Sequence, residues 1–315
     1  MDKYMPEQSM TSQYDDNVDL RELFAVLWTG RIKIVAITAI FAIVSLIYAL
    51  SVPNQYKATA LLSSADSSGG GLSGALGQLG GLASLAGVSL GGGENSEGQI
   101  AQEIMRSWSF IEGFIEDNTL AVGVYAADGW DSSSNEIEVD SDLYDVSKGQ
   151  WLVENDNTGE LGPPSSWRLF ETFSEILSVS EDKKSGLVSV SIEYYSPLIA
   201  KQWLDLYVAA INEHMQKREM AKVTRNIEYL QAQIKKTNIA EMQEVFYTII
   251  EEQIKSKMLA EASPEYAFVA VSPSMVPEQK SQPKRALMCI LGTLLGGMLS
   301  VLLVLVLHYG RKSAT

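Results

Sequence analysis

Very few side chains in this sequence have the type and spacing of a catalytic or metal-binding site. The single cysteine, Cys289, allows neither an intrachain disulfide nor a cysteine-ligated zinc site. The two histidines, His214 and His308, are 94 positions apart (308 − 214), which argues against a histidine metal cluster or a histidine-dependent triad. We therefore expect no catalytic residue, no metal ligand and no cofactor, and we predict that the protein is not an enzyme.

A glycine-rich stretch, Gly69–Gly93, holds 11 of the 24 glycines and has the composition of a phosphate-binding loop. Such a loop also needs a lysine that reaches the phosphates, in the pattern G-x4-G-K-[ST]. No lysine or arginine stands between Lys57 and Arg106. We therefore expect a packing loop that binds no nucleotide.

Acidic and aromatic side chains offer two further kinds of chemistry. Five aspartates cluster in one region without the spacing of a calcium-binding EF-hand loop, and we interpret them as solvated loop acids: Asp128, Asp131, Asp140, Asp142 and Asp145. Carboxylate pairs suited to glycoside hydrolysis arise in any acidic domain, so their presence is no evidence for or against a hydrolase. Three tryptophans are better interpreted as core or interface anchors than as sugar-stacking platforms: Trp130, Trp151 and Trp167.

Two long runs contain no charged residue and predict membrane-spanning helices. Ile34–Val52 has 19 residues and Ala286–Leu307 has 22. At about 1.5 Å per residue, each is long enough to cross a hydrocarbon core of about 30 Å. Basic residues Arg31 and Lys33 precede the first run, and Arg311 and Lys312 follow the second. The excess of basic residues on cytoplasmic loops then places both termini in the cytoplasm.

The spans divide the chain and its charge. We expect a cytoplasmic tail (1–33), a transmembrane helix (34–52), a periplasmic α/β base with its Gly-rich loop (53–196), a long helical segment (197–263), a last base strand with a proline-rich segment (264–285), a second transmembrane helix (286–308) and a cytoplasmic tail (309–315). Between the spans stand 18 basic and 33 acidic residues, a net charge of −15. This charge repels nucleic acid backbones, so we expect no nucleic acid partner.

The outer segment alternates between strand and helix patterns. We predict strands over Tyr56–Leu62, Ile176–Ser180, Leu187–Tyr194 and Ala267–Val271, helices over Ile100–Ile115 and Ser165–Phe173, and irregular loops with short hairpins over Gly123–Gly162. The fold class is therefore an α+β membrane protein, in which two transmembrane helices flank an extracytoplasmic α/β base with long extended helices.

Leu198–Ser263 contains no glycine or proline and predicts two long helices. Ser196 and Pro197 supply an N-cap and a first-turn proline, and Asn238 with Glu241 forms a capping-box pattern that restarts the helix. Helices of this length exceed what the base can cover, so their apolar stripes should pack on each other and on neighbouring copies of the chain. The stripe residues that we assign to this packing are Ile227, Leu230, Ile234, Met242 and Phe246.

The segment before the second span and the span itself carry a recognisable pattern. The stretch SPSMVPEQKSQPK contains Pro273, Pro277, Pro283 and Lys284, and GTLLGG contains Gly292, Gly296 and Gly297. Together with the two-span architecture, this resembles the Wzz-type chain-length determinants, the polysaccharide co-polymerases of bacterial inner membranes. Four other stretches are similar to the same family: DLRELFAVLWTGR, Tyr56–Leu62, SVSEDKKSGLVSVSIEYYSP and IEYLQAQIKKTNIAEMQ. The resemblance covers nearly the whole chain, with one departure, Ser281-Gln282-Pro283-Lys284 in place of the usual Ser-Pro-Lys.

The resemblance implies an oligomeric, non-enzymatic regulator of surface polysaccharide length, such as O-antigen lipopolysaccharide. It implies a ring-shaped homo-oligomer in the bilayer that acts on the nascent polysaccharide together with a Wzy-type polymerase. In physical terms, the prolines stiffen the approach to the bilayer, and Gly292, Gly296 and Ser300 form a small-residue face for close helix packing. Three alternatives remain: an exopolysaccharide export component with a separate tyrosine kinase, a transmembrane sensor, and a membrane-anchored hydrolase. The seven residues after His308 argue against the sensor, which would need a cytoplasmic output domain.

Overall fold

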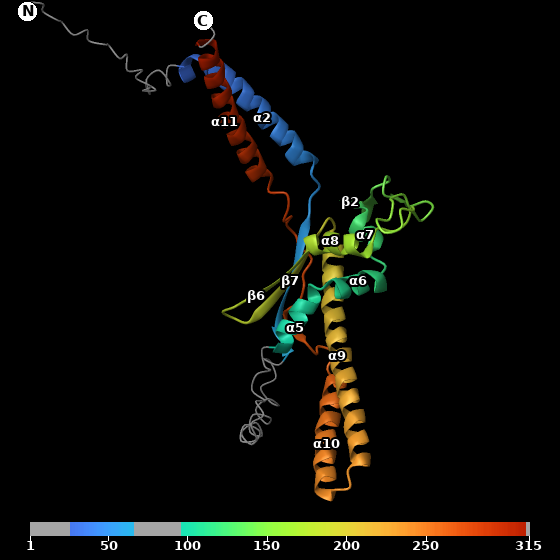
Figure 1. The fold of residues 1–315 in the computed structure, drawn as a ribbon. Coiled ribbons are helices and arrows are strands. Elements are labelled where there is room, and N and C mark those ends of the chain that lie inside the picture. The colour runs from blue at the N-terminus through green and yellow to red at the C-terminus, as the bar shows by residue number, and fades with distance from the viewer. Residues whose placement is uncertain (1–25, 66–95, 313–315) are drawn as a thin grey trace, which may run out of the picture. The chain divides into compact units, whose positions relative to one another are not determined.

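The computed structural model describes residues 26–65 and 96–312 and divides into two compact units (Figure 1). The first unit contains the chain up to Val52 and from Lys284 onward, and the second runs from Pro53 to Pro283. The glycine-rich stretch 69–93, with its leucines, and the tail up to residue 25 lie outside the described residues.

The first unit is a pair of helices, α2 (Arg31–Ser51) and α11 (Arg285–Lys312), which lie side by side in antiparallel directions. Both are long and apolar enough to cross a membrane, with mean hydropathies of 2.5 and 2.6. Their outward-facing side chains are mostly leucine, isoleucine and valine, and these are exposed in the isolated chain. Such a surface is suited to lipid, because acyl chains are as apolar as leucine.

The second unit is built on a four-stranded antiparallel sheet in the order β6-β7-β1-β8. Its strands are β1 (Tyr56–Ser64), β6 (Leu177–Asp182), β7 (Leu187–Tyr194) and β8 (Phe268–Ser272). The four predicted strands are therefore confirmed to within two residues at each end. Strand β7 follows its sequence alternation, since Val188, Val190, Ile192 and Tyr194 are all buried.

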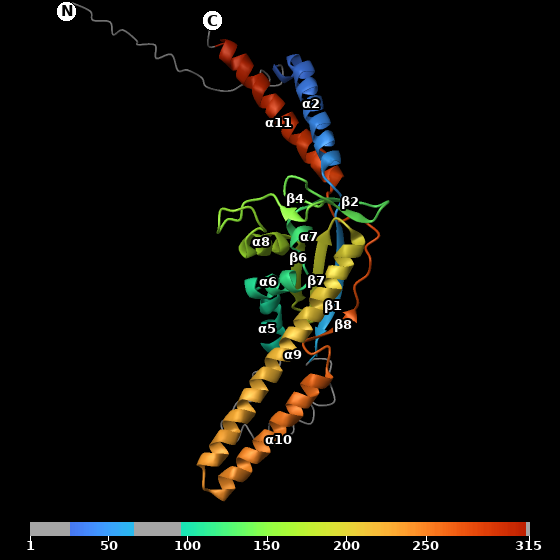
Figure 2. The same ribbon diagram turned by 90° about the vertical axis from the view of Figure 1, so that its right-hand side faces the viewer.

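Helices pack on this sheet and complete the core. They are α5 (Ser96–Met105), α6 (Trp108–Asp117), α7 (Ala121–Tyr125), α8 (Ser166–Ile176) and the first turns of α9 (Pro197–Lys236). Aromatic rings join these elements: Tyr207 of α9 lies edge-on to Phe114 of α6, with ring centroids 4.9 Å apart, and tilted against Phe173 of α8, at 5.6 Å. The N-terminal part of α9 is therefore an integral part of the base (Figure 2).

The single helix predicted over Ile100–Ile115 is wrong, because the chain breaks between α5 and α6. Ser107 has an extended backbone (φ −76°, ψ 143°) and occupies the N-cap position of α6. A tertiary contact accompanies this break: the carbonyl of Met105, at the end of α5, accepts a hydrogen bond from the buried hydroxyl of Tyr207 instead of from its own helix. A local periodicity cannot contain that contact, which spans 102 positions of sequence.

The region between α7 and α8 consists of short hairpins and turns, as predicted. Strands β2 (Ala127–Asp131) and β3 (Glu136–Val139) pair, and so do the two-residue strands β4 (Tyr144–Asp145) and β5 (Gln150–Trp151). The predicted helix over Ser165–Phe173 is α8, whose N-cap Ser165 accepts a hydrogen bond from the backbone N–H of Arg168.

The long helical segment forms an antiparallel hairpin of α9 and α10 (Ala240–Ala262) that extends from the base (Figures 1 and 2). The predicted cap at Ser196 is confirmed, with its side chain accepting from the N–H of Ile199. The capping box predicted at Asn238 is wrong: Ile239 precedes α10 and no side chain caps it. Instead, the amide of Gln243 donates to the carbonyls of Ile234 and Thr237 and so caps the end of α9.

Candidate functional site

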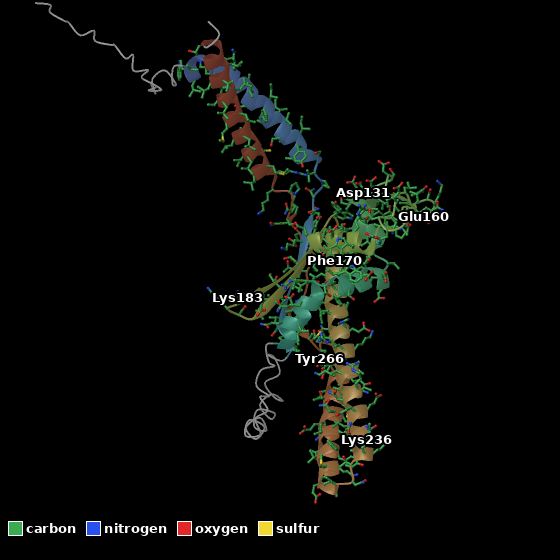
Figure 3. All side chains as sticks on the ribbon, viewed as in Figure 1. Asp131, Glu160, Phe170, Lys183, Lys236 and Tyr266 are labelled. Carbon is green, nitrogen blue, oxygen red and sulfur yellow. The ribbon has the colours of Figure 1, made fainter. Side chains whose placement is uncertain are left out.

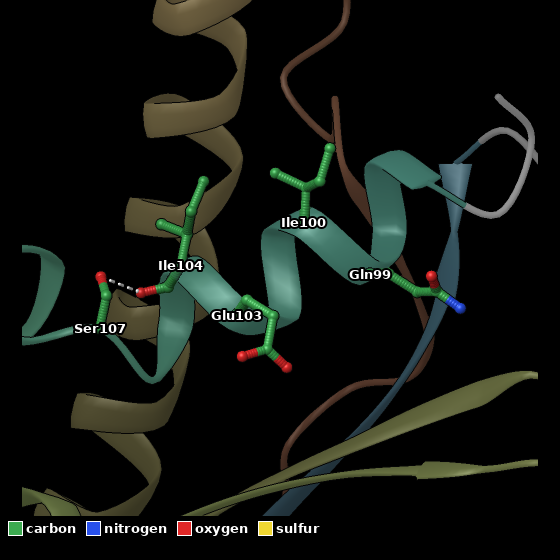
Figure 4. Close-up of a pocket in the computed structure, with 5 residues that line it drawn as sticks. All are labelled: Gln99, Ile100, Glu103, Ile104 and Ser107. Atoms are coloured by element: carbon green, nitrogen blue, oxygen red, sulfur yellow. Dashed lines mark hydrogen bonds between the residues drawn. The ribbon is translucent and has the colours of Figure 1, made fainter.

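An open, apolar hollow of about 410 Å³ lies along α5 (Figure 4). The residues around it are Gln99, Ile100, Glu103, Ile104 and Ser107. Its only ionisable side chain, Glu103, is paired with Arg106 at 3.0 Å. An apolar hollow with one ion-paired carboxylate has no acid–base pair, so this geometry does not support catalysis.

The loop aspartates hold turns together. Asp131 accepts hydrogen bonds from the hydroxyl and N–H of Ser133, and these bonds lower the pKa of Asp131. The pKa of Asp145 lies far below its ordinary value, mainly through its hydrogen bond from Ser147 and next through Lys148. These two carboxylates are half-buried and ionised, and their hydrogen bonds hold turns rather than a metal ion or a substrate (Figure 3 labels Asp131).

The three tryptophans differ in how they are held. Trp130 donates to Asn135 and packs edge-on against Tyr56 with ring centroids 6.0 Å apart, and Trp151 lies between the rings of Tyr125 and Tyr144. These two are packing anchors. Trp167 on α8 is 56% exposed, donates to the carboxylate of Glu171 and packs against Phe170.

The proline-rich segment is tied to the base at two points. Near its start, the hydroxyl of Ser274 hydrogen-bonds the carboxylate of Asp205 on α9. Near its end, Ser281 donates to Glu193 at 2.5 Å and to the carbonyl of Gln55 at 3.0 Å. Of the predicted residues here, Pro273 is exposed, Pro277 is half-buried and Pro283 is buried, with a cis Gln282–Pro283 peptide; Lys284 begins the other unit.

The small-residue face predicted on the second span lies against the first span of the same chain. A Cβ added at Gly292 would stand 2.5 Å from Ser45 Cβ, and one at Gly296 would stand 2.7 Å from Phe41 Cγ. Real Cβ atoms do not approach other heavy atoms so closely, so the two backbones meet only because both residues are glycine. We call Gly292, Gly296 and the fully buried Ser300 the glycine seam.

Two hydroxyl contacts reinforce the glycine seam. Ser45 donates to the carbonyl of Met288 at 3.0 Å, and Thr38 Oγ1 lies 3.4 Å from Ser300 Oγ. In an apolar surrounding, such contacts add to van der Waals packing as the force that joins two helices. Gly297 is different, since a Cβ there would meet only Thr38 Oγ1 at 3.9 Å.

Most of the predicted helix-packing residues lie inside the α9–α10 hairpin. Ile227, Leu230 and Ile234 are half-buried along the same face of α9 as the buried Val223, and Phe246 is half-buried on α10 near the buried Ile250. Met242, in contrast, has a side chain that is 45% exposed and does not lie inside the hairpin. Substitutions at Ile227 and Leu230 would therefore disturb the hairpin itself and could not isolate contacts between chains.

Met242 belongs to an apolar strip whose exposure to solvent the sequence analysis did not predict. Val245 and Ile249 follow Met242 at intervals of three and four, so the three side chains lie along one flank of α10, and all are exposed. The spacing is visible in the sequence. The sequence does not reveal whether this strip or the face with Phe246 and Ile250 packs against α9.

The chain is similar to known proteins in part of its sequence and in its solved relatives. Residues 16–117 match the family model of the Wzz chain length determinant protein, a match that includes α2, β1, α5 and α6. The chain is similar to the solved structure of a full-length bacterial polysaccharide co-polymerase at 15% identity and a TM-score of 0.40, covering 93% of this chain and 99% of that one. It is also similar to a fragment of WzzB, a polysaccharide co-polymerase from Salmonella Typhimurium, at 11% identity and a TM-score of 0.30, covering 73% and 100%. No curated protein matches.

Proposed function

Because residues 16–117 match the family model of the Wzz chain length determinant protein, we propose that the chain regulates the length of a surface polysaccharide without catalysing its synthesis. In this proposal the polysaccharide is the O-antigen of lipopolysaccharide, and a separate Wzy-type polymerase adds the repeat units. The family match is the observation that carries the proposal. The carboxylates with a lowered pKa also fit the proposal, because each of them holds a turn or forms an ion pair along a helix.

The proposal places α2 and α11 across the bacterial inner membrane and the second unit in the periplasm. One end of the helix pair holds the start of α2, with Arg31 and Lys33, and the end of α11, with Arg311 and Lys312. Because basic residues favour the cytoplasmic side of a membrane, the proposal assigns this end to the cytoplasm. Trp28 at this end is exposed and lies 5.1 Å from the guanidinium of Arg31. Aromatic residues of this kind are enriched at the level of the lipid headgroups.

The proposal also includes a ring of identical chains that associate through the periplasmic unit. The exposed strip Met242, Val245 and Ile249 supports this, because a water-facing helix flank rarely leaves three large apolar residues in a row. Burying the strip against a neighbouring chain would remove this apolar surface from water. The far end of the hairpin, marked by Lys236 in Figure 3, would then lie at the rim of the assembly farthest from its base.

Deletion of the gene tests the proposed function. Electrophoresis of the surface polysaccharide should show a defined length distribution in the parent strain and a broad, shifted one in the deletion strain, with restoration by the wild-type gene. An unchanged distribution in the deletion strain would refute the proposal. Loss of a secreted exopolysaccharide with unchanged lipopolysaccharide would instead indicate the export role.

A spanning-helix variant then tests whether the glycine seam contributes. Gly292→Leu with Gly296→Leu should lower length control at equal protein level in the membrane, because the leucines cannot fit against Ser45 and Phe41. Gly297→Leu is the matched control, since a Cβ there would meet only Thr38 Oγ1, at ordinary contact distance. Wild-type lengths from the double variant would show that the seam has no part in length control.

A further inference from the structure

The unit formed by α2 and α11 has an unbalanced charge. Residues 26–52 and 284–312 contain six basic residues and no aspartate or glutamate. Four of the six lie at the end of the pair that holds the start of α2 and the end of α11. Lys284 and Arg285, the outer cation pair, lie at the opposite end, and residues 26–52 and 284–312 offer no carboxylate to neutralise them.

Arg285 is held in a defined orientation. Its Nε donates to the carbonyl of Ala49 in the last turn of α2 at 3.0 Å, so it satisfies one of the carbonyls that a helix end leaves unpaired. A guanidinium carries five N–H donors, and this bond uses one of them. The two terminal nitrogens keep four donors in the planar fork that fits two oxygens of a phosphate.

Lys284 adds a second cation directly beside this fork. Its side chain is exposed and has neither an ion pair nor a side-chain hydrogen bond within the described ranges, 26–65 and 96–312. The first turn of α11 begins here and contributes the partial positive charge of a helix N-terminus. Two adjacent cations and a positive helix end give this end of the helix pair a positive potential that attracts anions.

We propose that Lys284 and Arg285 bind the phosphate group of an anionic membrane lipid. The uncharged run of α11 starts at Ala286, so the two cations stand at the boundary between hydrocarbon and headgroups, where lipid phosphates lie. Exposed apolar side chains flank them on both helices, namely Leu50, Leu287 and Ile290, and these would contact the acyl chains. The same exposed surface favours a lipid over free phosphate.

The assignment of this lipid to the periplasmic leaflet rests on the topology in the proposed function. Basic residues at that side of a span oppose the usual preference for cytoplasmic positive charge. A phosphate held between Lys284 and Arg285 compensates for that cost, and it would fix the depth at which α11 leaves the bilayer. The binding itself does not depend on any role in polysaccharide length.

Native mass spectrometry of the full-length protein in detergent tests the proposal. The probes are phosphatidylglycerol and phosphatidylcholine with identical acyl chains. The wild type should retain more phosphatidylglycerol than phosphatidylcholine. Lys284→Gln with Arg285→Gln should lower that preference by about 30-fold, from about fivefold for each cation. Arg285→Lys keeps the charge but loses the fork and the Ala49 contact, so it should lose an intermediate part of the preference.

Arg311→Gln with Lys312→Gln is the matched control, because it removes two cations from the other end of the same helix pair. It should lower the preference much less than the outer pair does. Equal losses from the two double variants would mean general electrostatic attraction and would overturn the proposal, as would equal retention of both lipids by the wild type. Displacement of the lipid by millimolar inorganic phosphate would overturn the choice of a lipid. None of these outcomes bears on length control, which the gene deletion tests separately.

Discussion

The protein contains two antiparallel helix pairs that are built in opposite ways. In the pair α9–α10, apolar side chains such as Ile250 lie between the helices and charged residues face outward. In the pair α2–α11, glycine and hydroxyl residues lie between the helices, while leucine and isoleucine face outward. Both pairs are antiparallel, but the large apolar residues lie between the helices in one pair and on the outside in the other.

The surroundings explain this exchange. In water, removal of apolar surface drives two helices together, so the large apolar residues belong between them. In lipid, an apolar side chain gains little by leaving the acyl chains, so close backbone approach and hydroxyl contacts supply the attraction. The positions of the large apolar residues therefore indicate which solvent each pair was built for, and their substitution should affect the two pairs differently.

The largest expected effect is the loss of stability caused by a charged residue in the interior of the α9–α10 hairpin. Ile250 is 8% exposed and its neighbour Ile249 is 37% exposed. Ile250→Asp would bury an unpaired carboxylate between the helices and should destabilise the hairpin by about 3 kcal/mol, measured by thermal unfolding and limited proteolysis of the full-length protein.

Ile249→Asp is the matched comparison on the same helix turn. It should change hairpin stability by no more than about 0.5 kcal/mol, because its side chain faces solvent in one chain. If the strip with Met242 and Val245 joins neighbouring chains, this variant should instead lower the mass of the assembly in detergent. An equal loss of hairpin stability from both variants would mean that the two faces of α10 are assigned incorrectly.

A smaller loss of stability is expected when a single methyl group is added between α2 and α11. Gly292→Ala places its Cβ against the side chain of Ser45, which must move, at a cost of about 1–3 kcal/mol. Ser45→Gly removes those side-chain atoms and should restore most of the lost stability in the double variant. Full recovery is not expected, because the hydrogen bond from Ser45 to the carbonyl of Met288 is also lost.

The loss and its recovery can be measured by thermal unfolding in detergent. Gly297→Ala serves as the control, since its added Cβ would meet only Thr38 Oγ1 at ordinary contact distance. If Gly292→Ala is as stable as the wild type, or if Ser45→Gly does not compensate, then Ser45 is not the neighbour that requires glycine.

The sequence predicted these elements to different degrees. The strands and long helices follow from periodicity and end signals, as at Leu187–Tyr194 and Ser196–Pro197, because local pattern and burial agree there. The break at Ser107 and the cap supplied by Gln243 were missed, since both depend on contacts with other parts of the chain. The glycines of α11 were identified by spacing, but their neighbours Ser45 and Phe41 could only come from the structure.

The smallest expected effect is a pH dependence in the water-facing pair. His214 of α9 packs edge-on against Phe110, and its pKa is lowered, first by partial burial and then by Arg218 and Lys217. Above the unfolded pKa of about 6.5, the imidazole is neutral in both states and has no effect on the pH dependence. As the pH falls through that value, the unfolded chain binds the proton more readily than the folded one, so stability decreases and then levels off below the folded pKa.

His214→Gln should remove this contribution. The difference in melting temperature between wild type and variant should change by about 1–2 °C between pH 7.5 and pH 5.5, with the wild type losing more. All other ionisable groups are present in both proteins, so the difference between them reports on His214. A wild type that loses no more stability than the variant on acidification would show that the ring is free to take up its proton in the folded state, which would contradict its packing against Phe110 beside two cations.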